Sequence, residues 1–181
     1  MQASAHDDTL RRIVDATAVK LHAEPGRGVV RYRATGAGGD GVRAEISIGR
    51  HRLVVDEPPS VGGQDAAANP VEHALAALLS CQVATYRLWA ARLGVPLDDI
   101  AIDVDGDLDV RGFFGLDDGV RPGFRDVRVT VTLTGPAEPE RYRELAAAVD
   151  EHCPVLDLFR NPTPVSTALV VRGLGQDGDH E

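Results

Sequence analysis

The positions of hydrophobic residues predict a helix near the start of the chain, followed by short strands. Residues 7–20 place leucine, isoleucine, valine and alanine at a helix-like spacing. After this segment the pattern changes to short runs rich in valine and isoleucine, at 29–35, 42–49 and 52–58. In the second run, Ala44, Ile46 and Ile48 alternate with polar residues, as in a strand with one buried face. The Gly/Asp-rich residues 36–41 and Gly49–Arg50 are expected to form turns.

A long apolar segment from residue 69 to residue 93 predicts a central helix. Asn69 is a good N-cap, Pro70 suits the first helical position, and Glu72 completes a capping box. Gly94 and Pro96 are expected to end the helix. Because residues 74–81 contain no charged side chain, the helix should be buried on nearly all sides at this level.

The rest of the chain predicts two longer strands, two helices and a final strand. Apolar side chains alternate with aspartates over 100–110 and with Arg and Thr over 127–133, so each strand should have one buried and one exposed face. Helices are expected at 138–151 and 153–160, and a last strand at 165–173. This order of elements indicates a single α+β domain at 26–173, with an N-terminal extension at 1–25, possibly helical, and a disordered tail at 174–181.

Charge and composition exclude several classes of partner. The net charge of −9 and the pI near 5.1 argue against binding to nucleic acid or to an anionic membrane. The sequence shows no signal peptide and no apolar run long enough to span a bilayer, so we expect a cytoplasmic protein. In that reducing compartment, a bond between the two cysteines would be transient and catalytic rather than a permanent crosslink.

Two motifs have a structural explanation that we favour over a functional one. Gly36, Gly38 and Gly41 spell the G-x-G-x-x-G of dinucleotide-binding loops, but a strand rather than a helix is expected to follow them. The acidic run at 103–109 suggests calcium, yet its glycine is misplaced for a calcium loop and strand alternation predicts a solvated face. The histidines lack metal-ligand spacing, so no metal site is predicted.

The two cysteines are the candidates for chemistry. Cys81 lies within the long apolar helix, where a thiol is either an inert core residue or a buried nucleophile. Cys153 precedes Pro154 at an expected helix start, where backbone N–H groups favour a thiolate. Glu72 is nine residues before Cys81, about 13–14 Å along the helix axis, so it can reach that sulfur only from a neighbouring subunit or through an arginine.

Several motifs in this order resemble the OsmC/Ohr family, the osmotically inducible and organic hydroperoxide resistance proteins. They are NP-x-E-(x)8-C on the long helix, DEP-(x)3-GG before it, GVPL after it, and CPV following a second helix. The resemblance covers roughly residues 28–172. It implies a divergent OsmC-like member that forms an intertwined homodimer, in which strongly curved antiparallel sheets wrap two long central helices.

The resemblance also implies a chemical cycle. Cys81 corresponds to the peroxidatic thiol and Cys153 to the resolving thiol of a peroxidase that acts on organic hydroperoxides or hydrogen peroxide. An external dithiol would reduce the resulting disulfide, and no cofactor would be required. The alternative function is a non-catalytic homodimer that binds a small apolar ligand.

This chain departs from the hydroperoxide-resistance branch at two positions. That branch has its glutamate directly after the helix-opening proline, whereas here Val71 follows Pro70 and the acid is Glu72. The expected activating arginine falls among Gly38, Gly39 and Asp40. The sequence offers five substitutes without ranking them: Arg31, Arg33, Arg43, Arg50 and Arg52.

Overall fold

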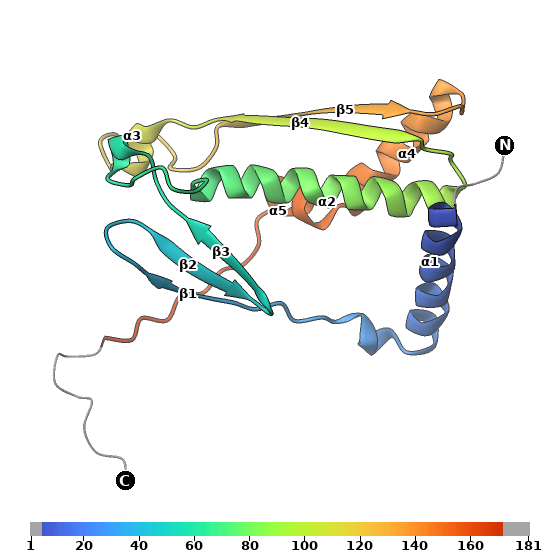
Figure 1. The fold of residues 1–181 in the computed structure, drawn as a ribbon, viewed down its shortest axis with the longest axis horizontal. Helices are drawn as coiled ribbons and strands as arrows, with labels where there is room; N and C mark the ends of the chain where they lie inside the picture. Colours follow the sequence, from blue (N-terminus) through green and yellow to red (C-terminus); the bar gives the residue numbers. More distant parts are fainter. Residues whose placement is uncertain (1–4, 172–181) are drawn as a thin grey trace, which may run out of the picture.

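The computed structural model describes residues 5–171 and shows an α+β fold arranged around one long helix (Figure 1). The elements in chain order are α1 (Ala5–Ala23), η1 (Pro25–Gly28), β1 (Ala34–Gly38), β2 (Ala44–Ile48), β3 (His51–Val55), η2 (Pro59–Val61), α2 (Pro70–Leu93), β4 (Asp99–Asp107), α3 (Val110–Phe113), β5 (Asp126–Thr134), α4 (Pro139–His152) and α5 (Pro154–Arg160). The helices predicted at 7–20, 138–151 and 153–160 are therefore present, the first of them longer than expected.

The ends of α2 form as the sequence predicts. The Asn69 side chain accepts a hydrogen bond from the Glu72 N–H at 2.9 Å, and the Glu72 carboxylate accepts one from the Asn69 N–H at 2.8 Å. At the other end, Gly94 adopts the left-handed conformation with φ of 64°. Together with Pro70 at the first turn, these local signals fix the length of the central helix.

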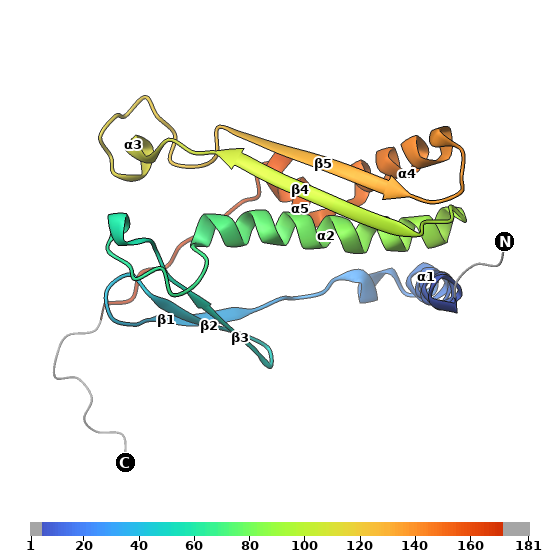
Figure 2. The ribbon, with the colours of Figure 1, turned by 45° about the horizontal axis from the view of Figure 1, so that its top comes forward.

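The hairpin of β4 and β5 covers one side of α2 (Figure 2). Its residues alternate strictly between partly buried and exposed, and pairs such as Ile102 with Val131 place the apolar face on α2. On the outer face, Arg128 pairs with Asp105, with Asp107 at 2.5 Å and with Asp126 at 3.1 Å. Asp103, Asp105 and Asp107 of the acidic run thus lie on the solvated face of a strand, as predicted, whereas Asp109 lies beyond the end of the strand.

The core lies between α2, the β4–β5 hairpin and the helices α4 and α5. Its most deeply buried side chains include Leu78 of α2 and Leu145 and Val149 of α4, each with 0% exposure. The helix α1 packs against α2 as well, whereas the β1–β3 sheet is antiparallel in the order β1-β2-β3 and lies on the side of α2 away from β4 and β5 (Figure 2).

The first strand forms later in the chain than the sequence predicts. Residues 29–33 are extended but unpaired, and β1 consists of Ala34–Gly38, most of which we expected to be a turn. The glycines fit the sheet because Gly36 pairs with Ile46, where a Cβ would lie only 3.2 Å from the Glu45 carbonyl oxygen. The turn follows at residues 39–43, with Gly41 at φ of 66°, so the three glycines belong to a hairpin and no helix follows them.

Two other expectations about strands were wrong. The strand expected to reach Val110 ends at Asp107, because the Asp109 side chain accepts the Arg111 N–H and begins the short helix α3. The strand expected at 165–173 is absent from residues 165–171, which are irregular and exposed, since no strand among the described residues pairs with them. Residues 172–173 and the tail at 174–181 lie outside the described residues.

Candidate functional site

The middle of α2 positions Cys81 on the inner side of the molecule. Its side chain is partly buried and packs against the core cluster that contains Cys153. One turn further along the helix, the Thr85 hydroxyl donates a hydrogen bond to the Cys81 carbonyl oxygen at 2.8 Å. The rigid, capped helix therefore holds this thiol in a fixed orientation inside the core.

Cys153 forms the junction between α4 and α5. Its N–H donates to the Val149 carbonyl oxygen at 2.9 Å, and its own carbonyl oxygen accepts from the Asp157 N–H at 3.0 Å. The side chain is only 2% exposed and makes no capping hydrogen bond to α5. The thiol thus points into the core toward α2 rather than serving the helix start.

The fold brings Cys81 and Cys153 together, because Cys81 packs against the core cluster to which Cys153 belongs. Burial raises the pKa of the Cys81 thiol, and the neighbouring Cys153 raises it further. The Val155 N–H and the Thr85 hydroxyl lower the same pKa, but burial is the larger effect. Cys81 is therefore held mainly as a neutral thiol within one chain.

Neither Glu72 nor any of the candidate arginines forms a hydrogen bond with Cys81 or Cys153 in the described residues. The Glu72 carboxylate is occupied by the Asn69 N–H at the start of α2, as its capping role requires. The five arginines at 31, 33, 43, 50 and 52 are exposed, and Arg43 pairs with Glu45 at 3.4 Å. Within residues 5–171, no guanidinium group donates a hydrogen bond to the Cys81 sulfur.

Sequence reasoning missed a polar residue beside Cys81. Gln82 is 3% exposed, and its Oε1 has no hydrogen-bond partner in the described part of the chain. Tyr86, one turn along, is also buried, and burial, followed by the charge of Asp150, raises its pKa. The signal for Gln82 was present in the sequence, since it is a polar residue within an otherwise apolar stretch of helix.

Gln82 and Tyr86 line a cavity of about 750 Å³ between α2, β5 and α5. The remaining wall comes from the loop that joins β4 to β5, through Arg121, Phe124 and Arg125. Cys81 does not line this cavity. In the described residues, no group of three or more His, Cys, Asp or Glu side chains is placed to hold a metal ion.

A family model described as OsmC-like protein matches residues 62–168, more than half of the chain and the part that contains both cysteines. The chain belongs to the OsmC-like family. The resemblance noted from the sequence motifs is thereby confirmed, and the antiparallel sheets and mixed α+β architecture agree with it. No curated protein matches the chain in sequence.

Solved structures of OsmC-like proteins share the fold at low sequence identity. An OsmC-like protein from Mycoplasma pneumoniae has a TM-score of 0.62 and 16% identity, with 72% of this chain and 88% of that chain covered. An organic hydroperoxide resistance protein from Elizabethkingia anophelis has a TM-score of 0.59 and 18% identity, with 73% and 89% covered.

A third structure, from Legionella pneumophila, is named an organic hydroperoxide resistance protein OsmC and predicted redox protein. It has a TM-score of 0.57 and 22% identity, with 73% of this chain and 90% of that chain covered. The likeness of this OsmC-like chain to all three is one of fold. Across residues 5–171, none of its helices is both long and apolar enough to cross a membrane.

Proposed function

We propose that this OsmC-like protein is a thiol-dependent peroxidase in which Cys81 attacks the peroxide and Cys153 resolves the product. The observation that carries the proposal is the meeting of the chain's two cysteines in one buried site, from α2 and from the α4–α5 junction. Relatives of the same fold from Legionella and Elizabethkingia are named organic hydroperoxide resistance proteins, which supports a peroxide as the substrate.

The proposed cycle has three steps. The Cys81 thiolate attacks the terminal peroxide oxygen, the O–O bond breaks, and the alkoxide takes up a proton and leaves as an alcohol, so that Cys81 becomes a sulfenic acid. The Cys153 thiolate then attacks the Cys81 sulfur and forms a disulfide, and the hydroxide that leaves takes up a proton to become water. An external dithiol reduces this disulfide through a mixed disulfide and restores both thiols. The cytoplasm, where we place the protein, keeps such cysteines reduced between turnovers.

The raised pKa of Cys81 means that the isolated chain activates its nucleophile weakly. Among the described residues, the Val155 N–H does most to stabilise its thiolate. A cation that lowers the pKa further would have to come from a second subunit or from a movement of the exposed arginines. Glu72, which caps α2, would contribute by orienting such an arginine rather than by touching the thiol.

We further infer a homodimer, because two apolar segments of the chain lack any cover. Val29 and Tyr32, which precede β1, are 88% and 89% exposed, and Val165 and Leu169 after α5 are 85% and 86% exposed. Neither segment pairs with a strand among the described residues, so a second copy could add them to its own sheet edges. A solution mass of twice 19.3 kDa in sedimentation or light scattering is the expected result.

The peroxidase proposal is tested by the consumption of an organic hydroperoxide in the presence of a dithiol. Wild type should turn over and Cys81→Ser should lose activity. Without the dithiol, Cys153→Ser should consume one equivalent of hydroperoxide and stop as a sulfenic acid. Ser80→Ala, an exposed neighbour on α2, serves as the matched control and should retain full activity. Equal rates for wild type and Cys81→Ser would end the proposal.

A second function, a dimer that binds a small ligand without turnover, is favoured by one observation. Burial holds Cys81 as a neutral thiol while an adjoining cavity of about 750 Å³ contains an unpartnered amide oxygen. In that case the thiols would be core residues, and Cys81→Ser would change neither peroxide consumption nor ligand binding.

A further inference from the structure

The cavity between α2, β5 and α5 has the size of a site for a small molecule. Its volume of about 750 Å³ lies within the range of ligand pockets, roughly 300–1,000 Å³. Valines of β5, including Val127 and Val129, and Leu156 of α5 form an apolar part of its wall. An elongated apolar body would be desolvated there by contacts of the kind that build a core.

The charged groups that line the cavity are three arginines and two aspartates, and two of the arginines form no ion pair with a described residue. Of the acids that line it, Asp150 already pairs with Arg160 at 3.0 Å, and Asp126 pairs with Arg128 at 3.1 Å. Neither Arg121 nor Arg125 forms a side-chain hydrogen bond or ion pair with a described residue. Arg125 does help to lower the pKa of Asp107 and Asp109, although less than the hydrogen bonds that these carboxylates accept from Arg128 and Arg111. In a chain of net charge −9, this local excess of positive charge is a specific feature that selects an anion.

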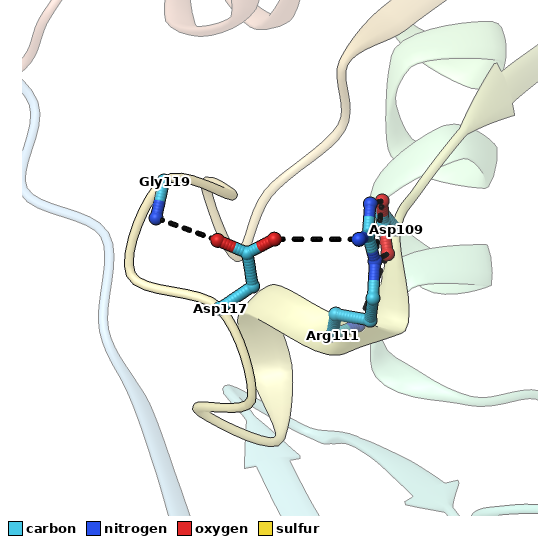
Figure 3. A network of polar contacts seen from close by, with 4 residues as sticks. All are labelled: Asp109, Arg111, Asp117 and Gly119. Carbon is cyan, nitrogen blue, oxygen red and sulfur yellow. Dashed lines mark hydrogen bonds and ion pairs between the residues drawn. The ribbon is translucent and has the colours of Figure 1, made fainter.

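The loop that carries these arginines is held in shape by polar contacts (Figure 3). The Arg111 guanidinium binds both oxygens of Asp109 and reaches Asp117 at 3.3 Å, and the Asp117 carboxylate accepts the Gly119 N–H at 3.0 Å. The side-chain hydrogen bond from Arg111 holds the pKa of Asp109 at about 2. The network remains charged at neutral pH and fixes the loop before any ligand arrives.

Two glycines place the loop against the hairpin. A Cβ at Gly112 would lie 2.6 Å from the Arg121 carbonyl oxygen, and a Cβ at Gly106 would lie 2.9 Å from the Phe124 ring. Only glycine permits these approaches without displacing the backbone at 121 or the aromatic ring. The wall formed by Arg121, Phe124 and Arg125 is therefore built into the fold and not a chance contact of a loose loop.

An unpaired polar atom in the cavity wall adds a second requirement for the ligand. Gln82 lines the cavity, is 3% exposed, and carries an Oε1 without a hydrogen-bond partner in the described residues. A buried amide oxygen in this state disfavours folding unless a donor reaches it. A hydroxyl group on the ligand would supply that donor.

We propose that this cavity binds an amphipathic monoanion, with its anionic head at Arg121 and Arg125, its hydrocarbon body along β5 and α5, and a hydroxyl at Gln82. Because Cys81 does not line the cavity, the site is separate from the proposed thiol chemistry. It needs no peroxide and no electron transfer.

The test measures binding to full-length Cys81→Ser protein by calorimetry, so that the outcome does not depend on peroxidase activity. The probes are dodecanoate, dodecyl phosphate and dodecanol, which share a chain and differ in the head. Both anions should bind at least about tenfold more tightly than dodecanol, and their order identifies the head as carboxylate or phosphate. Arg121→Gln/Arg125→Gln should remove this preference and leave dodecanol binding unchanged.

Arg143→Gln is the matched control, since Arg143 is an exposed residue of α4 that pairs with Glu140. It should bind the anions as wild type does. Equal affinity for dodecanol and the anions, or an anion preference that survives the double variant, would overturn the proposal. The proposal would also be wrong if no probe bound and residues 156–160 were protected from hydrogen exchange. In that case a second copy of the chain would cover the cavity.

The role of Gln82 is tested with dodecanoates hydroxylated at successive positions. One isomer should bind to the Cys81→Ser protein more tightly than dodecanoate does. In the double variant Cys81→Ser/Gln82→Leu, that isomer should bind no more tightly than dodecanoate. If no isomer is preferred, the assignment of Gln82 to a ligand hydroxyl is wrong.

Discussion

Replacing Gln82 with leucine is expected to make the ligand-free protein more stable. The side chain is 3% exposed and its Oε1 is unpaired in the described structure, a state that costs about 1–3 kcal/mol relative to a hydrogen-bonded amide. Leucine has a similar size, removes the unpaired oxygen and adds apolar contacts with the core. We expect the free energy of unfolding to rise by about 1–2 kcal/mol.

Urea unfolding followed by far-UV circular dichroism measures this change. With an m-value of about 2–3 kcal/mol/M, the midpoint should move up by about 0.5 M. The variants must be compared at one protein concentration, because association of subunits would contribute to stability.

Thr85→Val is the matched control for this experiment. Thr85 is buried on the same helix, but its hydroxyl is satisfied by the Cys81 carbonyl oxygen at 2.8 Å, so the free energy of unfolding should fall by about 0.5–1.5 kcal/mol. A loss of stability in Gln82→Leu as large as that in Thr85→Val would refute the reasoning, since it would mean that the amide is well paired in the folded protein. A higher free energy of unfolding for Gln82→Leu would show that the wild-type glutamine lowers the stability of the protein, as residues at binding sites commonly do.

Three further predictions concern the core, the thiol and the loop. Leu145→Ala removes a side chain with 0% exposure and should lower the free energy of unfolding by about 2–5 kcal/mol in urea titration, whereas a loss below about 1 kcal/mol would place Leu145 outside the core. Because burial raises the pKa of Cys81, the rate of its alkylation by iodoacetamide should keep rising with pH up to at least the ordinary thiol pKa of 9.0. A rate that stops rising near neutral pH would instead indicate a cation beside the sulfur. The Arg111 hydrogen bond lowers the pKa of Asp109 to about 2. The Asp109 carboxylate therefore stabilises the fold above its pKa in the unfolded chain, about 3.9, and this stabilisation is lost as the pH falls toward 2. Asp109→Asn should therefore unfold with a shallower acid dependence than wild type in this range, and an unchanged acid profile would contradict the ion pair.

The sequence predicts those elements whose signals are local. The α2 helix forms where Asn69, Pro70 and Glu72 begin it and Gly94 ends it, because each cap requires only neighbouring residues. The alternation in β4 and β5 was equally informative, since a strand with one buried face repeats every second residue whatever its partner is.

Features that depend on a distant or missing neighbour could not be predicted in this way. The strand β1 includes Gly36 because Ile46 lies opposite it, and a glycine-rich segment carries no hydrophobic pattern to indicate that pairing. Residues 165–171 of the expected last strand are largely apolar, but no strand among the described residues pairs with them.

The candidate site was predictable in part. Cys81 and Cys153 were identified from sequence, and the fold brings them together. The anionic-ligand cavity was missed because Gln82 is on α2 while Arg121 and Phe124 come from a loop about 40 residues later, and only the packing of α2 against the β4–β5 hairpin makes them neighbours.

The position of Cys153 between α4 and α5 connects the two proposed sites mechanically. Cys153 is the N-cap residue of α5, a helix of seven residues. A covalent bond formed at its sulfur would therefore constrain the position of that helix. The same helix supplies Leu156 and Phe159 to the cavity wall. A ligand that favours one position of α5 would then change how readily the dithiol is oxidised, and oxidation would change the ligand's affinity by the same factor. In this protein, the helix α5 would couple the oxidation state of Cys153 to the affinity of the cavity for its ligand.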